Sequence, residues 1–237
     1  MRVPEAITFW RVLLDYSLNS NSVRSIVLQN SLPRVFKAEP PKASEVWLQT
    51  NLHFDQGYNY LVSAESGAGK SSLCAYIYGY RRDYEGTILF DDKDLKLLTA
   101  RAWCEIRRNE IAYLPQDLRL FPELTASDNV LLKNSLTQHK TTKEIRDLFE
   151  VLGIMDKWSS PVGKLSIGQQ QRVAIIRLLC QRCQFYLLDE PVSHLDEINN
   201  RIVAQLIQEE AQRQVAAIIA TSVGNPLLLD YHHTLKL

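Results

Sequence analysis

A glycine-rich stretch between two apolar segments has the residue types of a phosphate-binding loop. A turn of this kind between a strand and a helix lets successive backbone N–H groups face phosphate oxygens. Glycine at the closest positions removes the Cβ atoms that would crowd those oxygens. We therefore expect nucleotide phosphates to bind at consecutive residues of this stretch: Ser66, Gly67, Ala68, Gly69, Lys70, Ser71 and Ser72.

Two side chains of this loop have expected roles of their own. Lys70 would reach the β- and γ-phosphates, and the Ser71 hydroxyl would coordinate Mg²⁺. Ala64 occupies the position at which such a loop usually has its first glycine. The motif is therefore slightly off pattern, and a chance Gly/Ser loop is the alternative.

Polar residues follow two continuous apolar runs farther along the chain. Residues 185–188 lead into Asp189 and Glu190, and residues 215–220 lead into Thr221 and Ser222. Continuous apolar runs indicate parallel strands, whose carboxyl ends form the ligand-binding edge of an open α/β sheet. At that edge Asp189 would hold Mg²⁺, directly or through water, and Glu190 would polarise an attacking water. Helix capping is the structural alternative for these acidic residues.

The hydrophobic pattern places further elements around the loop. Residues 58–62 are predicted to form a buried strand before it, and residues 73–78 a helix after it, ending at Gly79. A strand is also predicted over residues 25–29. Residues 31–44 contain three prolines and are predicted to be a loop.

The composition indicates a soluble globular chain without a dominant charge. It has 237 residues, 46% of them hydrophobic, and its 27 basic residues equal its 27 acidic ones. No apolar run approaches the ~18–20 residues of a membrane-spanning helix, and no signal-peptide pattern is present. Because no overall field favours it, we expect no nucleic-acid partner. Cys180 and Cys183 form half of a metal or redox motif without its second half, so reduced thiols are expected.

Residues Ser166-Ile167-Gly168-Gln169 are a candidate for a second anion-binding element. A helix that opens at about Gln169 would direct its free N–H groups and its dipole at a phosphate. With the phosphate loop before it and the acidic strand end after it, this order of motifs resembles the ATP-binding-cassette (ABC) ATPases over residues 25–237. The four residues stand where that family has its Ser-Gly-Gly-Gln signature.

The resemblance implies an α/β fold for residues 23–237. A P-loop NTPase core with a mostly parallel sheet would bind ATP and Mg²⁺, beside an antiparallel β subdomain and an inserted α-helical subdomain at about 120–165. The pattern of the inserted region itself predicts helices, including one over 142–152. Residues 1–22 would precede the ATPase domain as an amphipathic helical extension, with an apolar stripe formed by Val3, Ile7, Trp10, Leu14 and Leu18.

In that family the signature faces the phosphate loop of a second subunit, and two chains close around two ATP molecules. The resemblance therefore implies a homodimer or a heterodimer of ATPase chains, with Ser166, Gly168 and Gln169 acting across the interface. Ile167 departs from the family pattern. Its side chain must point away from the nucleotide for the site to work.

Other matches to the family occur in the expected order. Gln116 would contact Mg²⁺ and the attacking water, and residues 193–196 match the loop along the dimer interface, usually with alanine in place of His194. Phe36 is the candidate for stacking on adenine, with Trp47 as the alternative.

Ser222 is the largest departure, because the family has its switch histidine there, in contact with the γ-phosphate. Serine can donate a hydrogen bond but is shorter and carries no charge near neutral pH. We therefore expect ATP binding and dimer closure to be kept while hydrolysis is slow, with Ser222 in the place of a catalytic residue.

Residues 107–130 most resemble the group that serves lipoprotein release, cell division and macrolide export. That resemblance implies an integral membrane subunit as partner, and a cytoplasmic, peripheral location on the inner face of the cell membrane. A conventional importer or exporter stays open. So does a soluble or regulatory ABC protein that binds ATP with slow or no hydrolysis. A chromosome-type protein would need a long coiled coil between Lys70 and Asp189, for which there is no room.

Overall fold

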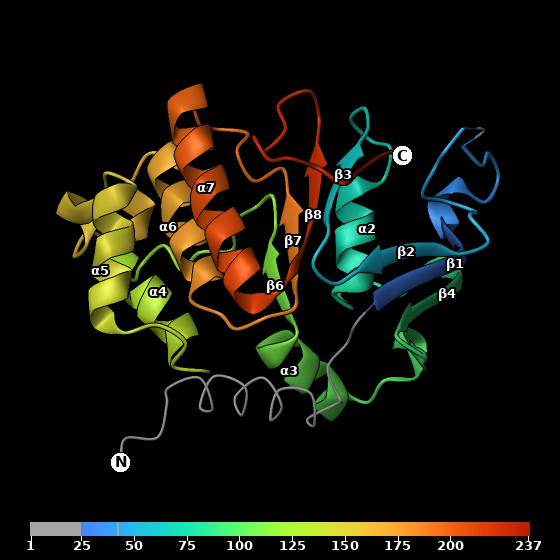
Figure 1. The fold of residues 1–237 in the computed structure, drawn as a ribbon, viewed down its shortest axis with the longest axis horizontal. Coiled ribbons are helices and arrows are strands. Elements are labelled where there is room, and N and C mark those ends of the chain that lie inside the picture. The colour runs from blue at the N-terminus through green and yellow to red at the C-terminus, as the bar shows by residue number, and fades with distance from the viewer. Residues whose placement is uncertain (1–24, 42) are drawn as a thin grey trace, which may run out of the picture.

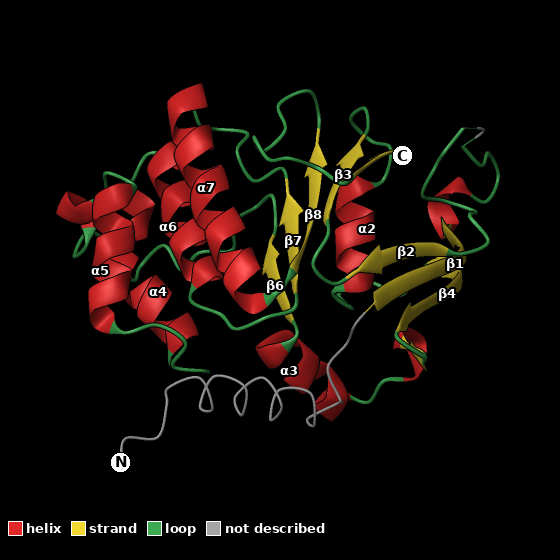
Figure 2. Ribbon diagram, in the orientation of Figure 1, coloured by secondary structure: helices red, strands yellow, loops and turns green. Residues whose placement is uncertain are grey.

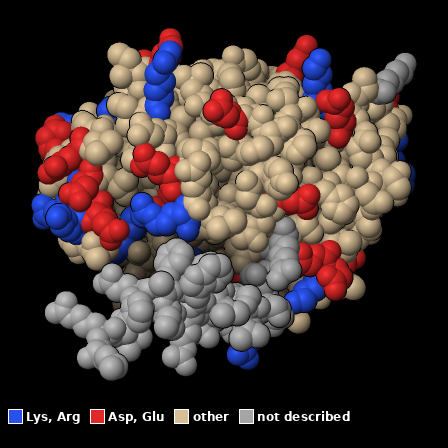
Figure 3. Space-filling view, viewed as in Figure 1, with Lys and Arg blue, Asp and Glu red and all other residues tan. Residues whose placement is uncertain are grey.

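A computed structural model describes residues 25–41 and 43–237 of the chain. The predicted extension over residues 1–22, with its amphipathic helix, lies outside the described residues. Within the described part, no helix combines the length and apolar character needed to cross a membrane. Acidic and basic side chains are interspersed on the face shown in Figure 3, as their equal numbers lead one to expect.

Five strands of the described chain form a parallel sheet in the order β6-β7-β8-β3-β9 (Figure 1). Their bounds are β3 Asn59–Ser63, β6 Ile111–Leu114, β7 Phe185–Asp189, β8 Ala217–Ser222 and β9 His233–Lys236. The strands predicted at 58–62, 185–188 and 215–220 are confirmed. The last begins two residues later than predicted, because Val215 has a φ of 54° as the left-handed cap of the preceding helix.

Helices cover both faces of this sheet (Figure 2). Alternate strand residues point to opposite faces. Leu187 and Ile219 pack with α2 and α3, whereas Leu188 and Ile218 pack with α4 to α7. The helix bounds are α2 Lys70–Ile77, α3 Ala100–Asn109, α4 Ala126–Asn134, α5 Thr142–Val151, α6 Ile167–Leu179 and α7 Glu197–Gln214. The central strands β7 and β8 are buried throughout and are largely apolar up to their polar carboxyl ends, as the sequence indicated.

A second, antiparallel sheet follows the order β2-β1-β4-β5. Its bounds are β1 Ser25–Pro33, β2 Leu52–Asp55, β4 Tyr84–Phe90 and β5 Lys93–Asp94. The prediction that the first strand ends at residue 29 and that a loop begins at 31 is wrong. Asn30 adopts a φ of 48° and makes a bulge, after which buried Leu32 resumes pairing with Glu85 of β4. A short 3₁₀ helix, Arg34–Phe36, follows.

Residues 120–165, between β6 and α6, contain helices and no named strand, as predicted. Helices α4 and α5 begin at threonine caps, Thr125 and Thr141, whose hydroxyls accept hydrogen bonds from the first turn. Helix α5, Thr142–Val151, matches the predicted helix over 142–152. Both helices pack against α6 through buried side chains such as Val130 and Phe149.

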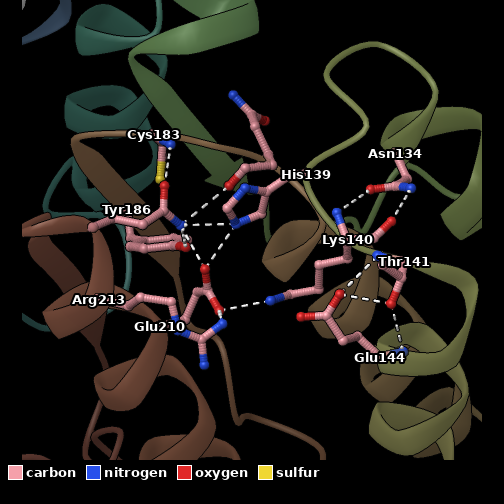
Figure 4. A network of polar contacts seen from close by, with 11 residues as sticks. Asn134, His139, Lys140, Thr141, Glu144, Cys183, Tyr186, Glu210 and Arg213 are labelled. Atoms are coloured by element: carbon pink, nitrogen blue, oxygen red, sulfur yellow. Dashed lines mark hydrogen bonds and ion pairs between the residues drawn. The ribbon is translucent and has the colours of Figure 1, made fainter. Parts of the chain in front are cut away.

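A buried ionic cluster joins α7 to the connection between α4 and α5 (Figure 4). The Glu210 carboxylate lies 2.7 Å from Lys140 Nζ, 2.8 Å from His139 Nε2 and 3.0 Å from Arg213 Nη1. Gln214 Nε2 donates to it at 2.9 Å. Burial alone would raise the pKa of Glu210, but the hydrogen bonds from His139 and Lys140 outweigh it and lower that pKa to about 2. The cluster therefore holds a carboxylate that is charged at neutral pH between these two parts of the fold.

Candidate nucleotide-binding site

The phosphate loop connects β3 to the first residue of α2. Gly67 and Gly69 have φ values of 84° and 101°, which side chains rarely adopt. A Cβ atom on Gly69 would also lie 3.1 Å from Phe36 Cε2 and 3.4 Å from Trp47 Nε1. Helix α2 begins at Lys70, earlier than predicted, so its N-terminal N–H groups adjoin the loop. The two left-handed glycines and the helix start at Lys70 together give the loop backbone the shape of an anion-binding cradle.

Lys70 is folded into this loop. Its side chain is 5% exposed, and Nζ donates to the carbonyl oxygens of Glu65 at 2.9 Å and Ala64 at 3.3 Å. The same nitrogen lies 3.9 Å from Glu190 Oε1. The ammonium therefore stands between the phosphate loop and the acidic end of β7.

The carboxyl edge of the sheet brings the predicted acidic residues and Gln116 together. Asp189 is buried, and its Oδ1 accepts a hydrogen bond from Thr221 Oγ1 at 2.9 Å. Glu190 donates its backbone N–H to the same hydroxyl at 3.3 Å. Gln116 Nε2 lies 3.4 Å from Glu190 Oε2. Glu190 has a φ of 52°, a strained backbone for a residue with a Cβ.

A cavity of about 540 Å³ opens between the loop and this edge. Ser71, Gln116 and Asp189 all line it, and Tyr113 closes one side. Hydroxyl, amide and carboxylate oxygens are the ligands that Mg²⁺ prefers, so this donor set fits that ion. Burial raises the pKa of Tyr113 far above its usual value, so its phenol stays neutral there. The site thus joins a cationic loop to a set of oxygen ligands.

Ser222 ends β8 directly beside the phosphate loop. Its carbonyl oxygen accepts a hydrogen bond from Ala64 N at 3.2 Å. Its hydroxyl is buried and has no hydrogen-bond partner among the described residues. A buried hydroxyl without a partner costs about 1–3 kcal/mol, so this group is suited to bind a ligand or a water.

The second anion-binding element is the start of α6. The helix predicted here is present, and it begins two residues before the expected start at about Gln169, with Ser166 as its cap and Ile167 as its first residue. Ser166 Oγ accepts from Gln169 N at 3.4 Å, and the Gln169 side chain accepts from Ser166 N at 3.0 Å. Ile167 is 49% exposed. A Cβ atom on Gly168 would lie 3.1 Å from the His194 carbonyl oxygen, which brings the signature against the loop at 193–196.

Phe36 and Trp47, the two candidates for stacking on adenine, differ in how exposed their side chains are. Trp47 is only 1% exposed, and its ring nitrogen lies 3.5 Å from the Ala68 carbonyl oxygen. Phe36 is half-buried and contacts the edge of the loop at Gly69. A base could therefore reach the ring of Phe36 but not that of Trp47.

Three polar residues around the site were not predicted. Thr221 forms hydrogen bonds with both Asp189 and Glu190, and its position at the polar end of a buried apolar run was a usable signal. Gln171 is buried and spans from the Glu190 carbonyl oxygen to the His194 N–H. Arg177 donates to backbone carbonyl oxygens just beyond Gln116. Polar residues within a helix usually face water, so the last two contacts could not be predicted from the sequence.

Comparison with known proteins decides the family. A family model described as ABC transporter matches residues 48–193. This chain belongs to the ABC transporter family. An uncharacterized ABC transporter ATP-binding protein of Mycobacterium tuberculosis is 31% identical over 174 residues, which are 72% of this chain and 53% of that protein. The chain thus spans about half the length of that relative.

Two further similarities bear on this ABC chain. The lipoprotein-releasing system ATP-binding protein LolD of Shewanella denitrificans is 28% identical over 196 residues, covering 81% of this chain and 84% of LolD. The ATP-binding cassette MJ0796, solved as a dimer in a post-hydrolysis state bound to ADP and Pi, has a TM-score of 0.67 at 25% identity. The match covers 84% of this chain and 88% of that one. The fold is therefore the α/β P-loop NTPase fold of ABC cassettes, as predicted.

Proposed function

We propose that this chain is the ATP-binding and ATP-hydrolysing subunit of an ABC-type membrane complex. The main observation is that four residues meet at one edge of the sheet. Asp189 and Gln116 line the cavity beside the phosphate loop, and Glu190 lies 3.4 Å from Gln116 and 3.9 Å from Lys70. A cation that neutralises phosphates and a carboxylate that orients water are the two groups that phosphoryl transfer to water requires. The residues of a single chain supply both.

Each residue has a distinct part in this reaction. Lys70 would exchange its two loop carbonyl oxygens for the β- and γ-phosphate oxygens. Mg²⁺, held by Ser71, Asp189 and Gln116, would neutralise charge that develops on the phosphates. Glu190 would accept a hydrogen bond from the attacking water and align it. Phe36 would support the adenine ring.

The same geometry favours a site shared between two chains. Helices α2 and α6 cover opposite faces of the parallel sheet, so the two anion-binding helix starts of one chain belong to different faces. Ser166, Gly168 and Gln169 would therefore bind the γ-phosphate of ATP held by a second chain. MJ0796, with ADP and Pi, is a dimer. The second chain would be a copy of this one or an unlike ATPase chain.

Hydrolysis should be slow in this chain. Ser222 stands where a histidine would contact the γ-phosphate, and its short hydroxyl is buried beside the loop. Ala64 and Ile167 depart from the motifs as well. A regulatory ABC protein that binds ATP with little or no turnover is therefore the second candidate function.

A separate integral membrane subunit would receive the motion of the ATPase chains. The similarity to LolD fits the lipoprotein-release, cell-division and macrolide-export group, and a conventional importer or exporter stays open as the alternative. The helices within residues 120–165 would form the subdomain that docks the membrane subunit. The chain would then lie on the cytoplasmic face of the cell membrane.

The test is Mg²⁺-dependent release of phosphate from ATP by the purified chain, with Lys70→Ala as the control. We expect slow release by the native chain and none above background by the variant. Light scattering with Mg²⁺ and ATP, on Glu190→Gln alone and mixed with a candidate partner chain, would detect the dimer. Equal phosphate release by the native chain and Lys70→Ala would overturn the proposal.

A further inference from the structure

Helix α6 contacts the candidate site at two places beyond its N-terminus. Gln171, early in the helix, reaches the backbone after β7, and Arg177, near its end, reaches the backbone after β6. These are the two chain segments that carry Glu190 and Gln116. One helix therefore lies against both of the polar loops that would handle the attacking water.

The Arg177 guanidinium donates hydrogen bonds to two successive backbone carbonyl oxygens. Its Nη1 donates to the Arg119 carbonyl oxygen at 2.7 Å, and its Nη2 donates to the Leu118 carbonyl oxygen. A guanidinium presents its donors in a fixed planar fork, so it fixes the relative direction of two acceptors. Hydrogen bonds from a charged donor are also stronger than those between neutral groups.

The two residues that Arg177 contacts have a strained backbone. Leu118 and Arg119 have φ values of 55° and 46°, so two consecutive residues with Cβ atoms adopt the left-handed conformation. Such residues are disfavoured and persist only when their surroundings hold them. Leu118 is buried, and its N–H donates to the Pro115 carbonyl oxygen at 3.0 Å, closing a tight turn around Gln116.

The direction of Gln116 depends on this turn. The residue is exposed and its side chain has one described hydrogen bond, at 3.4 Å to Glu190. Glu190 is left-handed as well, with its carbonyl oxygen 3.5 Å from Gln171 Nε2. Without the turn held in place, nothing on the Gln116 side chain itself would fix its direction.

We propose that Arg177 is a positioning residue, which holds the left-handed turn at Leu118–Arg119 so that Gln116 faces Glu190. The proposal rests on the proposed function where its effect is measured as ATP hydrolysis. Arg177 does not line the cavity beside the phosphate loop. Its loss should therefore slow the chemical step rather than weaken ATP binding.

Arg177→Met tests this role, because it removes the donors and keeps much of the side-chain length. We expect kcat to fall at least about tenfold, with KM for ATP within about twofold, because both charge-assisted hydrogen bonds that hold the turn are lost. Combining Arg177→Met with Arg119→Gly should bring kcat close to that of Arg119→Gly alone, because glycine adopts a positive φ without strain. Arg119→Gly alone is the reference because Arg119 lines the cavity. Arg108→Met removes another guanidinium-to-carbonyl hydrogen bond, to Leu136, and should leave kcat unchanged. Equal losses in the Arg177 and Arg108 variants, or no rescue by Arg119→Gly, would overturn the proposal.

Amide hydrogen exchange supplies a readout that does not need turnover. In the nucleotide-free chain, Arg177→Met should speed exchange over residues 115–120 and leave β7 and β8 unchanged. If Arg177→Met fails to fold, Arg177→Lys replaces it, because lysine lacks the planar fork. Unchanged exchange at 115–120 would overturn the proposal. Absence of ATP hydrolysis by the native chain would instead contradict the proposed function, and exchange would still decide the role of Arg177.

Discussion

Two glutamates of this molecule, Glu190 and Glu210, are held in opposite ways. Glu210 is buried, with Lys140, His139, Arg213 and Gln214 donating to it at 3.0 Å or less. Glu190 lies 3.9 Å from its nearest cation, Lys70, and 3.4 Å from Gln116, on a left-handed backbone.

This difference indicates that the Glu210 carboxylate stabilises the fold, whereas the Glu190 carboxylate is free to take part in catalysis. A carboxylate whose hydrogen-bonding capacity is filled cannot accept a new bond from water without losing an old one. Glu190 has long contacts and a strained backbone, so it keeps lone pairs for a water molecule. Strain of that kind is typical of functional sites. The comparison predicts that removing Glu190 affects rate, whereas removing Glu210 affects stability.

Glu190→Gln should produce the largest effect. Loss of a general base lowers a rate by roughly 10²–10⁴-fold, so phosphate release should become hard to detect. The melting temperature should stay close to that of the native chain, because few short contacts are lost. Phosphate release and thermal unfolding of the same preparation check both parts. A large drop in melting temperature would show that Glu190 also stabilises the fold, which would contradict the distinction from Glu210.

Glu210→Gln should lower the free energy of unfolding by about 3–4 kcal/mol, because it leaves buried Lys140 without its countercharge. Urea unfolding measures this. The control is Glu197→Gln on the same helix, which removes an exposed ion pair with Arg201. Exposed pairs contribute little, so the control should unfold like the native chain. Similar decreases in the free energy of unfolding of both variants would show that burial does not determine how much a carboxylate stabilises the fold.

The contribution of Glu210 should also depend on pH. Its pKa is lowered to about 2 in the folded chain, from 4.5. The stabilisation is therefore complete above pH 4.5 and is lost as the pH falls toward 2. This pH-dependent part of the free energy of unfolding should amount to about 3 kcal/mol. It should be absent in Glu210→Gln, which has no carboxylate to titrate at this position. Urea unfolding across this range checks it, and identical acid profiles for the two chains would contradict it.

Ser222→His should have the smallest effect, in the opposite direction. An imidazole at the end of β8 would reach farther toward a γ-phosphate than the serine hydroxyl does. We expect phosphate release to rise about tenfold, as for one added hydrogen bond to a charged group. If the native chain is already fast and histidine adds nothing, the interpretation of Ser222 is wrong.

The nucleotide edge was largely predictable because local sequence dictates it. Lys70 stands in a glycine-rich loop, and Asp189 and Glu190 directly follow a buried strand, so the parallel sheet had to bring them to one edge. The start of α6 was placed too late because the Ser166 cap was not recognised. The bulge at Asn30 hid the second half of β1.

Contacts between distant segments could not be predicted in the same way. Glu210 meets His139 and Lys140 across about 70 residues of sequence. Arg177 meets Leu118 and Arg119 across almost 60. In both cases the partners are polar residues without a spacing pattern, so only the packing of α6 and α7 brings them together.

The decisive experiment is equilibrium binding of labelled ATP to Glu190→Gln and to Lys70→Ala, each with Mg²⁺. In the proposed site the nucleotide lies between the phosphate loop and the loosely held Glu190. Glu190→Gln should therefore retain ATP without consuming it, and Lys70→Ala should retain none. Equal retention by the two variants, or none by Glu190→Gln, would contradict the account.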